Sequence, residues 1–209
     1  MVSKGNTCYL FGGRNDEAAC NLLFTFCAKS YRWKRPLVQG DIPGERDGHS
    51  AAIVGNFMYV FGGYEENYER FGQDVYRLDL ETYTWKLMVG DQVTCPPLIL
   101  NMSDQSCSGE PPVHRDFHTA TAVGDMMVIF GGRSDLTTGA HWQVNNLGPD
   151  YYSNKVSYYD TVTNTWISPQ PGILPLPPGS TPEIFPKAGF GSKINSRIWP
   201  SKPDTWLSN

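Results

Sequence analysis

An apolar run that ends in two glycines occurs three times in this chain of 209 residues. The three segments are Tyr9–Gly13, Tyr59–Gly63 and Val128–Gly132. The first two lie 50 residues apart, and the third follows after another 69. Repeats of this length indicate a structural unit that cannot bury its own apolar face and stacks on its neighbours to form a core. The chain is therefore predicted to fold as a series of similar units.

Two further signatures keep a constant order around the double glycine. Arg46-Asp47-Gly48-His49 precedes the second copy and Arg115-Asp116-Phe117-His118 the third, with 13 residues from each histidine to the first glycine. A tryptophan ends each unit, at positions 33, 85 and 166. Because all three signatures recur together, a chance match of a lone double glycine does not explain the pattern.

The residues between these signatures predict a sheet of four strands in each unit. Ser50–Val54 alternates in polarity and leads into the turn dipeptide Gly55-Asn56. Phe57–Phe61 is apolar throughout, as expected of a strand that is covered on both faces. Asp74–Asp79 and Thr84–Met88 supply the third and fourth strands. No stretch has helical periodicity, so the fold class is all-β. Sheets that are covered on both faces by their neighbours are typical of propeller blades, and the prediction is a partial β-propeller of about three four-stranded blades.

This pattern resembles the kelch repeat, whose length is about 50 residues. On that basis the kelch repeats cover residues 1–169, with blade one at 1–38, blade two at 43–90 and blade three at 112–169. A surplus at 92–109 is expected to form an external loop. Residues 170–209 are rich in Pro, Ser and Gly, and a disordered tail is expected there.

The recurring residues receive structural roles. Glycine allows positive φ and the close approach of another backbone, the tryptophans are expected to pack between blades, and the Arg/Asp/His set is expected to satisfy buried backbone groups near the propeller axis. Copies in several blades cannot all be an active site. The structural signature comprises Gly12, Gly13, Trp33, His49, Gly62, Gly63, Trp85, His118, Gly131, Gly132 and Trp166.

Composition excludes several classes of function. The net charge of −4 has the wrong sign for a chain that binds nucleic acid through phosphates. The longest apolar runs are far shorter than a membrane helix requires, and Met1–Gly5 contains no apolar signal region. The five cysteines form no CxxC pair and are expected to be reduced, buried side chains. We expect a protein of the cytoplasm or nucleus that contacts neither nucleic acid nor membrane directly.

No catalytic residue, metal site or cofactor is predicted. Kelch frames that carry chemistry use either a Tyr–Cys copper centre or an ExxxDxxxH iron motif, and the sequence contains no ExxxDxxxH. His114 and His118 lie four residues apart but have no evident third ligand. The chain is therefore expected to bind proteins and not to be an enzyme.

Within the kelch family, the chain resembles one subfamily of kelch domain-containing proteins. The resemblance rests on Phe11–Asp16, Pro43–Ala51, Tyr59–Glu65 and Arg115–His118. It implies a substrate receptor of a cullin-RING ubiquitin ligase that captures C-terminal degrons, often ending in glycine. The implied partners are C-terminal peptides of substrates, elongin and cullin adaptors in an intact parent protein, and chromatin proteins. The alternatives are a scaffold associated with chromatin or actin, or a non-functional truncated product.

Strand parity predicts where a partner would bind. In an antiparallel four-stranded blade, the loop after the second strand and the segment before the first lie at the same end. Arginine can pair with a peptide carboxylate and tyrosine adds contact area. The rim expected to bind partners contains Arg14, Arg46, Tyr64, Arg115 and Arg133.

The ends of the repeat region suggest an incomplete ring. By the spacing of the other units, the first histidine would fall before Met1, and no fourth Arg-x-x-His with a double glycine follows Trp166. Since a propeller needs about 4–8 blades, the chain alone is expected to associate with other chains.

Overall fold

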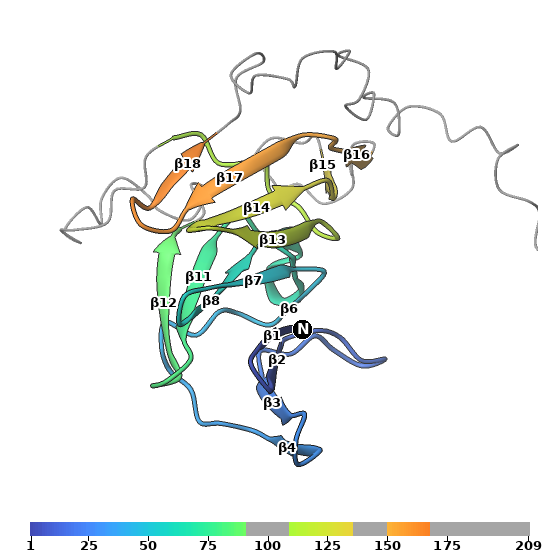
Figure 1. Cartoon of the computed structure of the whole chain (residues 1–209). Coiled ribbons are helices and arrows are strands. Elements are labelled where there is room, and N and C mark those ends of the chain that lie inside the picture. Colours follow the sequence, from blue (N-terminus) through green and yellow to red (C-terminus); the bar gives the residue numbers. More distant parts are fainter. Residues whose placement is uncertain (91–108, 136–149, 168–209) are drawn as a thin grey trace, which may run out of the picture.

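The computed structural model describes residues 1–90, 109–135 and 150–167, and the three main β-sheets of this part of the chain are stacked one on another (Figure 1). In Figure 1 the N-terminal sheet lies at the bottom and the C-terminal sheet at the top. The four main strands of each blade are antiparallel to their neighbours and lie side by side in the order in which they occur along the chain. The predicted all-β fold of about three four-stranded blades is therefore confirmed. Within the described part of the chain, no helix has the length and apolar character needed to cross a membrane.

Blade one contains β1 (Val2–Lys4), β2 (Thr7–Phe11), β3 (Leu23–Cys27) and β4 (Arg32–Lys34), hydrogen-bonded in that order. In the loop between β2 and β3, Asn15 accepts hydrogen bonds from the backbone N–H groups of Glu17 and Ala18.

Blade two contains β7 (Ser50–Val54), β8 (Phe57–Phe61), β11 (Val75–Asp79) and β12 (Thr84–Val89). The first two strands have the predicted bounds, and the third begins one residue later than predicted. A fifth strand, β5 (Gln39–Gly40), pairs in parallel with β12 at the outer edge. The sequence analysis missed β5, because two residues show no strand pattern.

Blade three contains β13 (Thr119–Val123), β14 (Met126–Phe130), β17 (Val156–Asp160) and β18 (Thr165–Ile167). Its strands pair in the same order as those of blade two. The expected loop at 92–109, except its last residue, and the expected tail at 170–209 lie outside the described residues.

Short ribbons form the ends of the blades near the double glycines. One is a three-stranded sheet in the order β10-β9-β6, and the other is a pair of β15 with β16. The elements are β6 (Arg46–Asp47), β9 (Tyr64–Glu65), the 3-10 turn η1 (Glu66–Tyr68), β10 (Arg70–Phe71), β15 (Arg133–Asp135) and β16 (Asp150–Tyr152).

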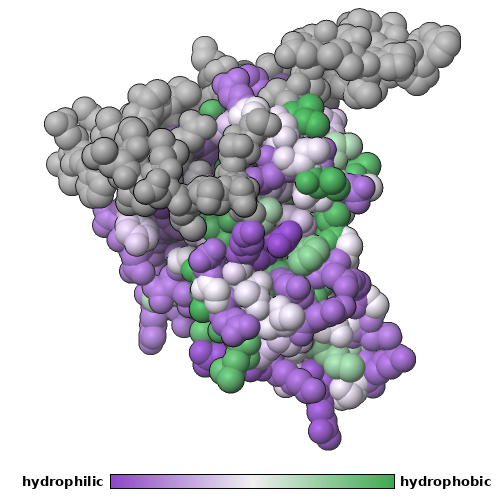
Figure 2. Space-filling view, turned by 90° about the vertical axis from the view of Figure 1, so that its left-hand side faces the viewer, coloured by the Kyte–Doolittle hydropathy of each residue, from purple (hydrophilic) through white to green (hydrophobic). Residues whose placement is uncertain are grey.

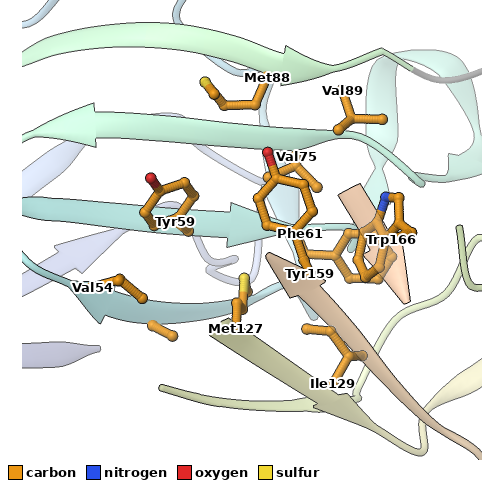
Figure 3. Packing of buried hydrophobic residues seen from close by; sticks show 11 residues of the cluster. Val54, Tyr59, Phe61, Val75, Met88, Val89, Met127, Ile129, Tyr159 and Trp166 are labelled. Atoms are coloured by element: carbon orange, nitrogen blue, oxygen red, sulfur yellow. The ribbon is translucent and has the colours of Figure 1, made fainter. Parts of the chain in front are cut away.

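Each joint between blades is formed by two different faces. The face of a blade that carries its tryptophan, here the tryptophan face, packs on the phenylalanine face of the preceding blade. The Trp85 and Phe11 rings are 4.7 Å apart, and the Trp166 and Phe61 rings are 5.2 Å apart. The joint between blades one and two contains Tyr9, Phe11 and Leu23 against Met58, Val60, Leu78 and Trp85. The joint between blades two and three contains Tyr59, Phe61 and Val75 against Met127, Ile129, Tyr159 and Trp166 (Figure 3).

The apolar core thus lies between the blades. The side of the molecule seen in Figure 2 is mostly polar, with apolar side chains in small groups among polar ones. Burial of apolar surface stabilises a folded chain by about 25 cal/mol per Å². These joints are therefore the main source of stability.

Trp33 corrects the prediction that every tryptophan packs between blades. Trp85 is 1% exposed, whereas Trp33 is 54% exposed and contacts the tilted ring of Phe26 in its own sheet, with 5.0 Å between the ring centroids. The described chain has no blade before blade one, so no phenylalanine face covers Trp33.

The double glycine is explained by two close approaches of backbone. A Cβ on Gly62 would lie 2.7 Å from the carbonyl oxygen of Arg115 in the next blade, and one on Gly63 would lie 2.6 Å from the carbonyl oxygen of Asp47. Both glycines also have positive φ, +63° and +95°. Gly13 has nearly the same φ as Gly63, +97°, but a Cβ on Gly13 would point into open space, with no atom beyond its chain neighbours within 4 Å.

We expect Gly63→Ala to reduce the free energy of unfolding by about 3 kcal/mol or more, and Gly13→Ala by about 1 kcal/mol. The two changes share the cost of a positive φ, but only Gly63→Ala places a methyl group against backbone. Urea unfolding of both variants, followed by circular dichroism, measures the difference. Equal losses would contradict the role assigned to the close approach.

Candidate functional site

The loops and short ribbons at one end of the blades form a continuous rim. Backbone hydrogen bonds join each blade to the next there: the Gly13 N–H donates to the Arg46 carbonyl, and the Gly63 N–H donates to the Arg115 carbonyl, both at 2.9 Å. Within blade three, Arg133 and Asp116 form a further backbone bridge, which joins the segment before β13 to the segment after β14. The rim comprises residues 13–20, 43–49, 63–73, 113–118 and 131–135.

Arg46 lies fully buried beneath the rim. Its Nη1 donates to the Gly62 carbonyl at 3.1 Å and to Asp74 at 2.7 Å, and its Nη2 donates to Glu65. Burial alone would lower the pKa of Arg46, but the Asp74 and Glu65 carboxylates raise it above its ordinary value. Charge compensation on this scale is what allows a guanidinium group to lie inside a protein.

Glu65 connects this buried pair to the surface. Its second oxygen accepts hydrogen bonds from Nη2 and Nε of Arg70, at 2.7 and 2.8 Å. The guanidinium group of Arg70 lies 5.1 Å from the centre of the exposed Tyr68 ring. The cluster therefore has no net charge, because it contains two arginines, Arg46 and Arg70, and two carboxylates, Glu65 and Asp74.

Arg115 occupies the place of Arg46 in the next joint and is also buried. Its Nη1 donates to the Gly131 carbonyl and its Nε to the Val113 carbonyl, both at 2.7 Å. The guanidinium groups of Arg46 and Arg115 thus bind backbone carbonyls in the interior. This corrects their inclusion in the partner-binding rim, because neither side chain reaches the surface.

Arg133 lies at the surface between two aromatic rings. Its guanidinium carbon is 5.3 Å from the ring centres of both Phe71 and Phe117. Asp116, which is buried, accepts hydrogen bonds from Nη2 at 2.7 Å and Nε at 3.2 Å. His114 stacks on Phe71, with 6.3 Å between the ring centroids. The arrangement combines cation–π contacts with a bidentate ion pair.

Phe117 is held in an unusual backbone conformation. Its φ is +52°, in the left-handed region, and its side chain is 65% exposed. Blade two has Gly48 at the same place, with φ +63°. A large residue with positive φ costs roughly 1–2 kcal/mol relative to glycine. A strained conformation that exposes an aromatic ring is a reason to suspect a functional role.

The remaining rim residues lie over the joint between blades one and two. Arg14 pairs with Glu66 at 2.8 Å, and the Ala19 N–H donates to the other oxygen of Glu66 at 2.7 Å. The backbone hydrogen bond from Ala19, followed by the Arg14 charge, lowers the pKa of Glu66. Tyr64 packs against the edge of Phe71, with ring centroids 5.6 Å apart.

Of the five rim residues expected from the sequence, Arg14, Tyr64 and Arg133 are thus at least partly exposed, and Arg46 and Arg115 are not. The sequence analysis missed Phe117 and the aromatic pair formed by Phe71 and His114. One signal was available for Phe117: it replaces the glycine of the Arg-Asp-Gly-His copy, at a position where the backbone needs a positive φ.

The two signature histidines lie at the joints, where His118 is buried and His49 is half-buried. His49 meets the edge of Phe11 at 5.5 Å, and His118 meets the edge of Phe61 at 5.1 Å. Burial, reinforced by the neighbouring arginine, lowers the pKa of His49 to about 4 and that of His118 to about 3. Both side chains are therefore neutral at physiological pH. Among the described residues, no three His, Cys, Asp or Glu side chains gather as metal ligands would.

Comparison with known proteins gives one consistent result. The family model described as the KLHDC2/KLHL20/DRC7 Kelch-repeats domain matches residues 1–185. Kelch domain-containing protein 3 of Rattus norvegicus is 36% identical over 214 residues, which cover 96% of this chain and 50% of that protein. The Homo sapiens protein of that name is 35% identical over 98% of this chain and 49% of its own length. Kelch domain-containing protein 1 of Homo sapiens is 26% identical over 84% of this chain. The chain thus spans about half the length of these curated relatives.

Acidification is expected to destabilise the fold through His49 and His118. The unfolded chain regains the ordinary histidine pKa of about 6.5 and then binds more protons than the folded chain. The free energy of unfolding should therefore fall as the pH drops from about 6.5 towards 4, by about 1–2 kcal/mol per histidine at pH 5.

Urea unfolding at pH 7.5 and pH 5, with the wild-type chain and His118→Gln, measures this effect. The variant should lose less stability than the wild type over this interval, because it lacks one of the two groups. If the variant and the wild type lose the same free energy of unfolding between the two pH values, His118 does not contribute.

Proposed function

This chain belongs to the kelch-repeat family, whose repeats form protein-interaction modules, and we propose that it binds a segment of a partner protein at the rim around Phe117 and Arg133. The observation that carries this proposal is the conformation of Phe117. Its ring is exposed at the cost of a positive φ, although glycine occupies the corresponding position of blade two. Selection for stability alone would favour glycine there.

The contacts around Phe117 are suited to a protein partner. Arg133 supports one face of the ring and is itself held by Asp116, so the aromatic side chain is presented in a defined position. Exposed Tyr68, over Arg70, adds a second aromatic ring on the same rim. Aromatic residues and arginine are the side chains that contribute most to protein interfaces, and rings that are fixed before binding lose little entropy.

The variant Phe117→Gly tests the proposal. We expect it to match or exceed the wild type in free energy of unfolding, because glycine relieves about 1–2 kcal/mol of backbone strain. We expect binding to fall at least tenfold for peptides selected by the wild-type chain from a displayed random library, measured by isothermal titration calorimetry.

Tyr31→Gly provides the matched control. Tyr31 is also an exposed aromatic residue with positive φ, +55°, but it lies in the turn between β3 and β4, away from the rim. Its replacement should leave peptide binding unchanged. If Phe117→Gly keeps full affinity for the selected peptides, or if it destabilises the chain by several kcal/mol, Phe117 has no binding role and the proposal fails.

We further propose that blades of this kind serve a substrate receptor of a cullin-RING ubiquitin ligase, with the C-terminal segment of a substrate as the bound peptide. In such a receptor these three blades would supply an aromatic wall of the site. The carboxylate of the peptide would have to pair with a cation outside this rim, because four arginines of the rim already pair with carboxylates of this chain. These pairs are Arg14–Glu66, Arg46–Asp74, Arg70–Glu65 and Arg133–Asp116.

The 209-residue chain alone is accordingly expected to show no measurable affinity for glycine-ended peptides that depends on their free carboxylate. Fluorescence anisotropy with one labelled peptide, prepared with a free and with an amidated C-terminus, makes the comparison. Micromolar binding that disappears on amidation would show that three blades suffice for carboxylate capture.

A further inference from the structure

We propose that two copies of the 209-residue chain associate head to tail, with the tryptophan face of blade one in each copy covering the phenylalanine face of blade three in the other. The occupant of each open face is thus a second copy of this chain. The two joints would close a ring of six blades.

The proposal starts from the regularity of the two joints inside the chain. Corresponding positions recur in each: Met58, Leu78 and Trp85 of blade two match Met127, Tyr159 and Trp166 of blade three, and all six side chains are buried. Because the same residue positions form both joints, each outward face of blades one and three can be identified as a tryptophan face or a phenylalanine face.

Blade one exposes an unused tryptophan face. By strand register, Cys8, Phe26 and Trp33 form one cross-strand row on that face, and Leu10 and Phe24 form the adjacent row. These side chains are half-buried or exposed, whereas their blade-two counterparts in the first row, Met58, Leu78 and Trp85, are buried. Trp33 already packs against the Phe26 ring in an arrangement that a neighbouring blade could cover.

Blade three exposes the opposite half. Phe130 stands where Phe11 and Phe61 stand in the other blades, yet it is 40% exposed while those two are buried. Val128 and Val156, on the same face, are half-buried, whereas their counterparts Tyr59 and Val75 are buried. Val123 of the neighbouring strand is also exposed.

The two open faces differ, and each is the complement of the other. A contact between different faces of two copies is heterologous, so it closes only if successive copies return to the start. Two copies of three blades make six, which lies within the 4–8 blades of known propellers, whereas three copies would make nine. Closure would cover the two open faces of the described blades.

The joint between copies should be weaker than those within the chain. Within the chain, the Gly63 N–H donates to the Arg115 carbonyl and His118 packs on Phe61. Within the 209-residue chain, blade one offers apolar side chains but no Arg-Asp-x-His segment to this joint. Association should therefore depend on protein concentration.

Sedimentation equilibrium of the wild-type chain over a range of concentrations tests the assembly. A subunit of 23.4 kDa should give a species of about 47 kDa that does not grow further as the concentration rises. Trp33→Lys and Phe130→Lys should each yield monomers, because each removes one half of every joint. Both residues are exposed, so both variants should keep the circular dichroism and the melting behaviour of a folded chain.

Mixing the two variants distinguishes complementary faces from general stickiness. The Trp33→Lys chain keeps an intact phenylalanine face and the Phe130→Lys chain an intact tryptophan face, so a 1:1 mixture should recover a species of two chains joined once. Tyr68→Lys, which changes an exposed rim tyrosine away from both faces, should assemble like the wild type.

Three results would overturn the proposal. They are a wild-type chain that stays monomeric at the highest concentration reached, dimers that persist in either lysine variant, and a mixture that fails to associate. Growth of the wild type beyond two subunits would overturn the closed ring.

Discussion

A blade of this protein is a small sheet with two apolar faces, and a sheet cannot cover its own faces. The requirement for a neighbour on each side determines where the core lies, since the buried side chains belong to joints between blades. It also explains why equivalent residues differ so much in exposure. Trp33 and Trp85 occupy the same place in their strands, but only Trp85 has a phenylalanine face against it.

Polar contacts complete each joint where the apolar contacts end. The segment before the first strand of a blade crosses the double glycine of the preceding blade, and the absence of Cβ atoms there allows backbone to meet backbone. The arginine of that segment turns inward and donates to the carbonyl of the first glycine in its own blade. In blade two, Asp74 and Glu65 neutralise the buried charge, so one guanidinium group ties three segments together.

The same arrangement limits what the rim can offer to a partner. Its arginines are engaged by neighbouring carboxylates or carbonyls, which leaves exposed aromatic rings as the distinctive feature of the surface. Phe117 stands apart because its place in the repeat suits glycine, and the residue that replaces glycine there is large, exposed and supported by Arg133. A rim of this kind favours contact through ring surface over capture of a charged group.

The sequence by itself determined the all-β class, the strands of blade two to within a residue or two, and the turn at Gly55-Asn56, because period, spacing and turn chemistry are local properties. Tertiary structure alone decided which copies of a repeated residue are buried. Arg46 looks like a surface arginine in the sequence, and its burial depends on Asp74, 28 residues away along the chain. Trp33 looks like Trp85, and its exposure depends on the absence of a preceding blade in the described chain. Repetition in a sequence specifies equivalent positions within each unit, but burial is a property of neighbours, and neighbours differ at the two ends of a stack.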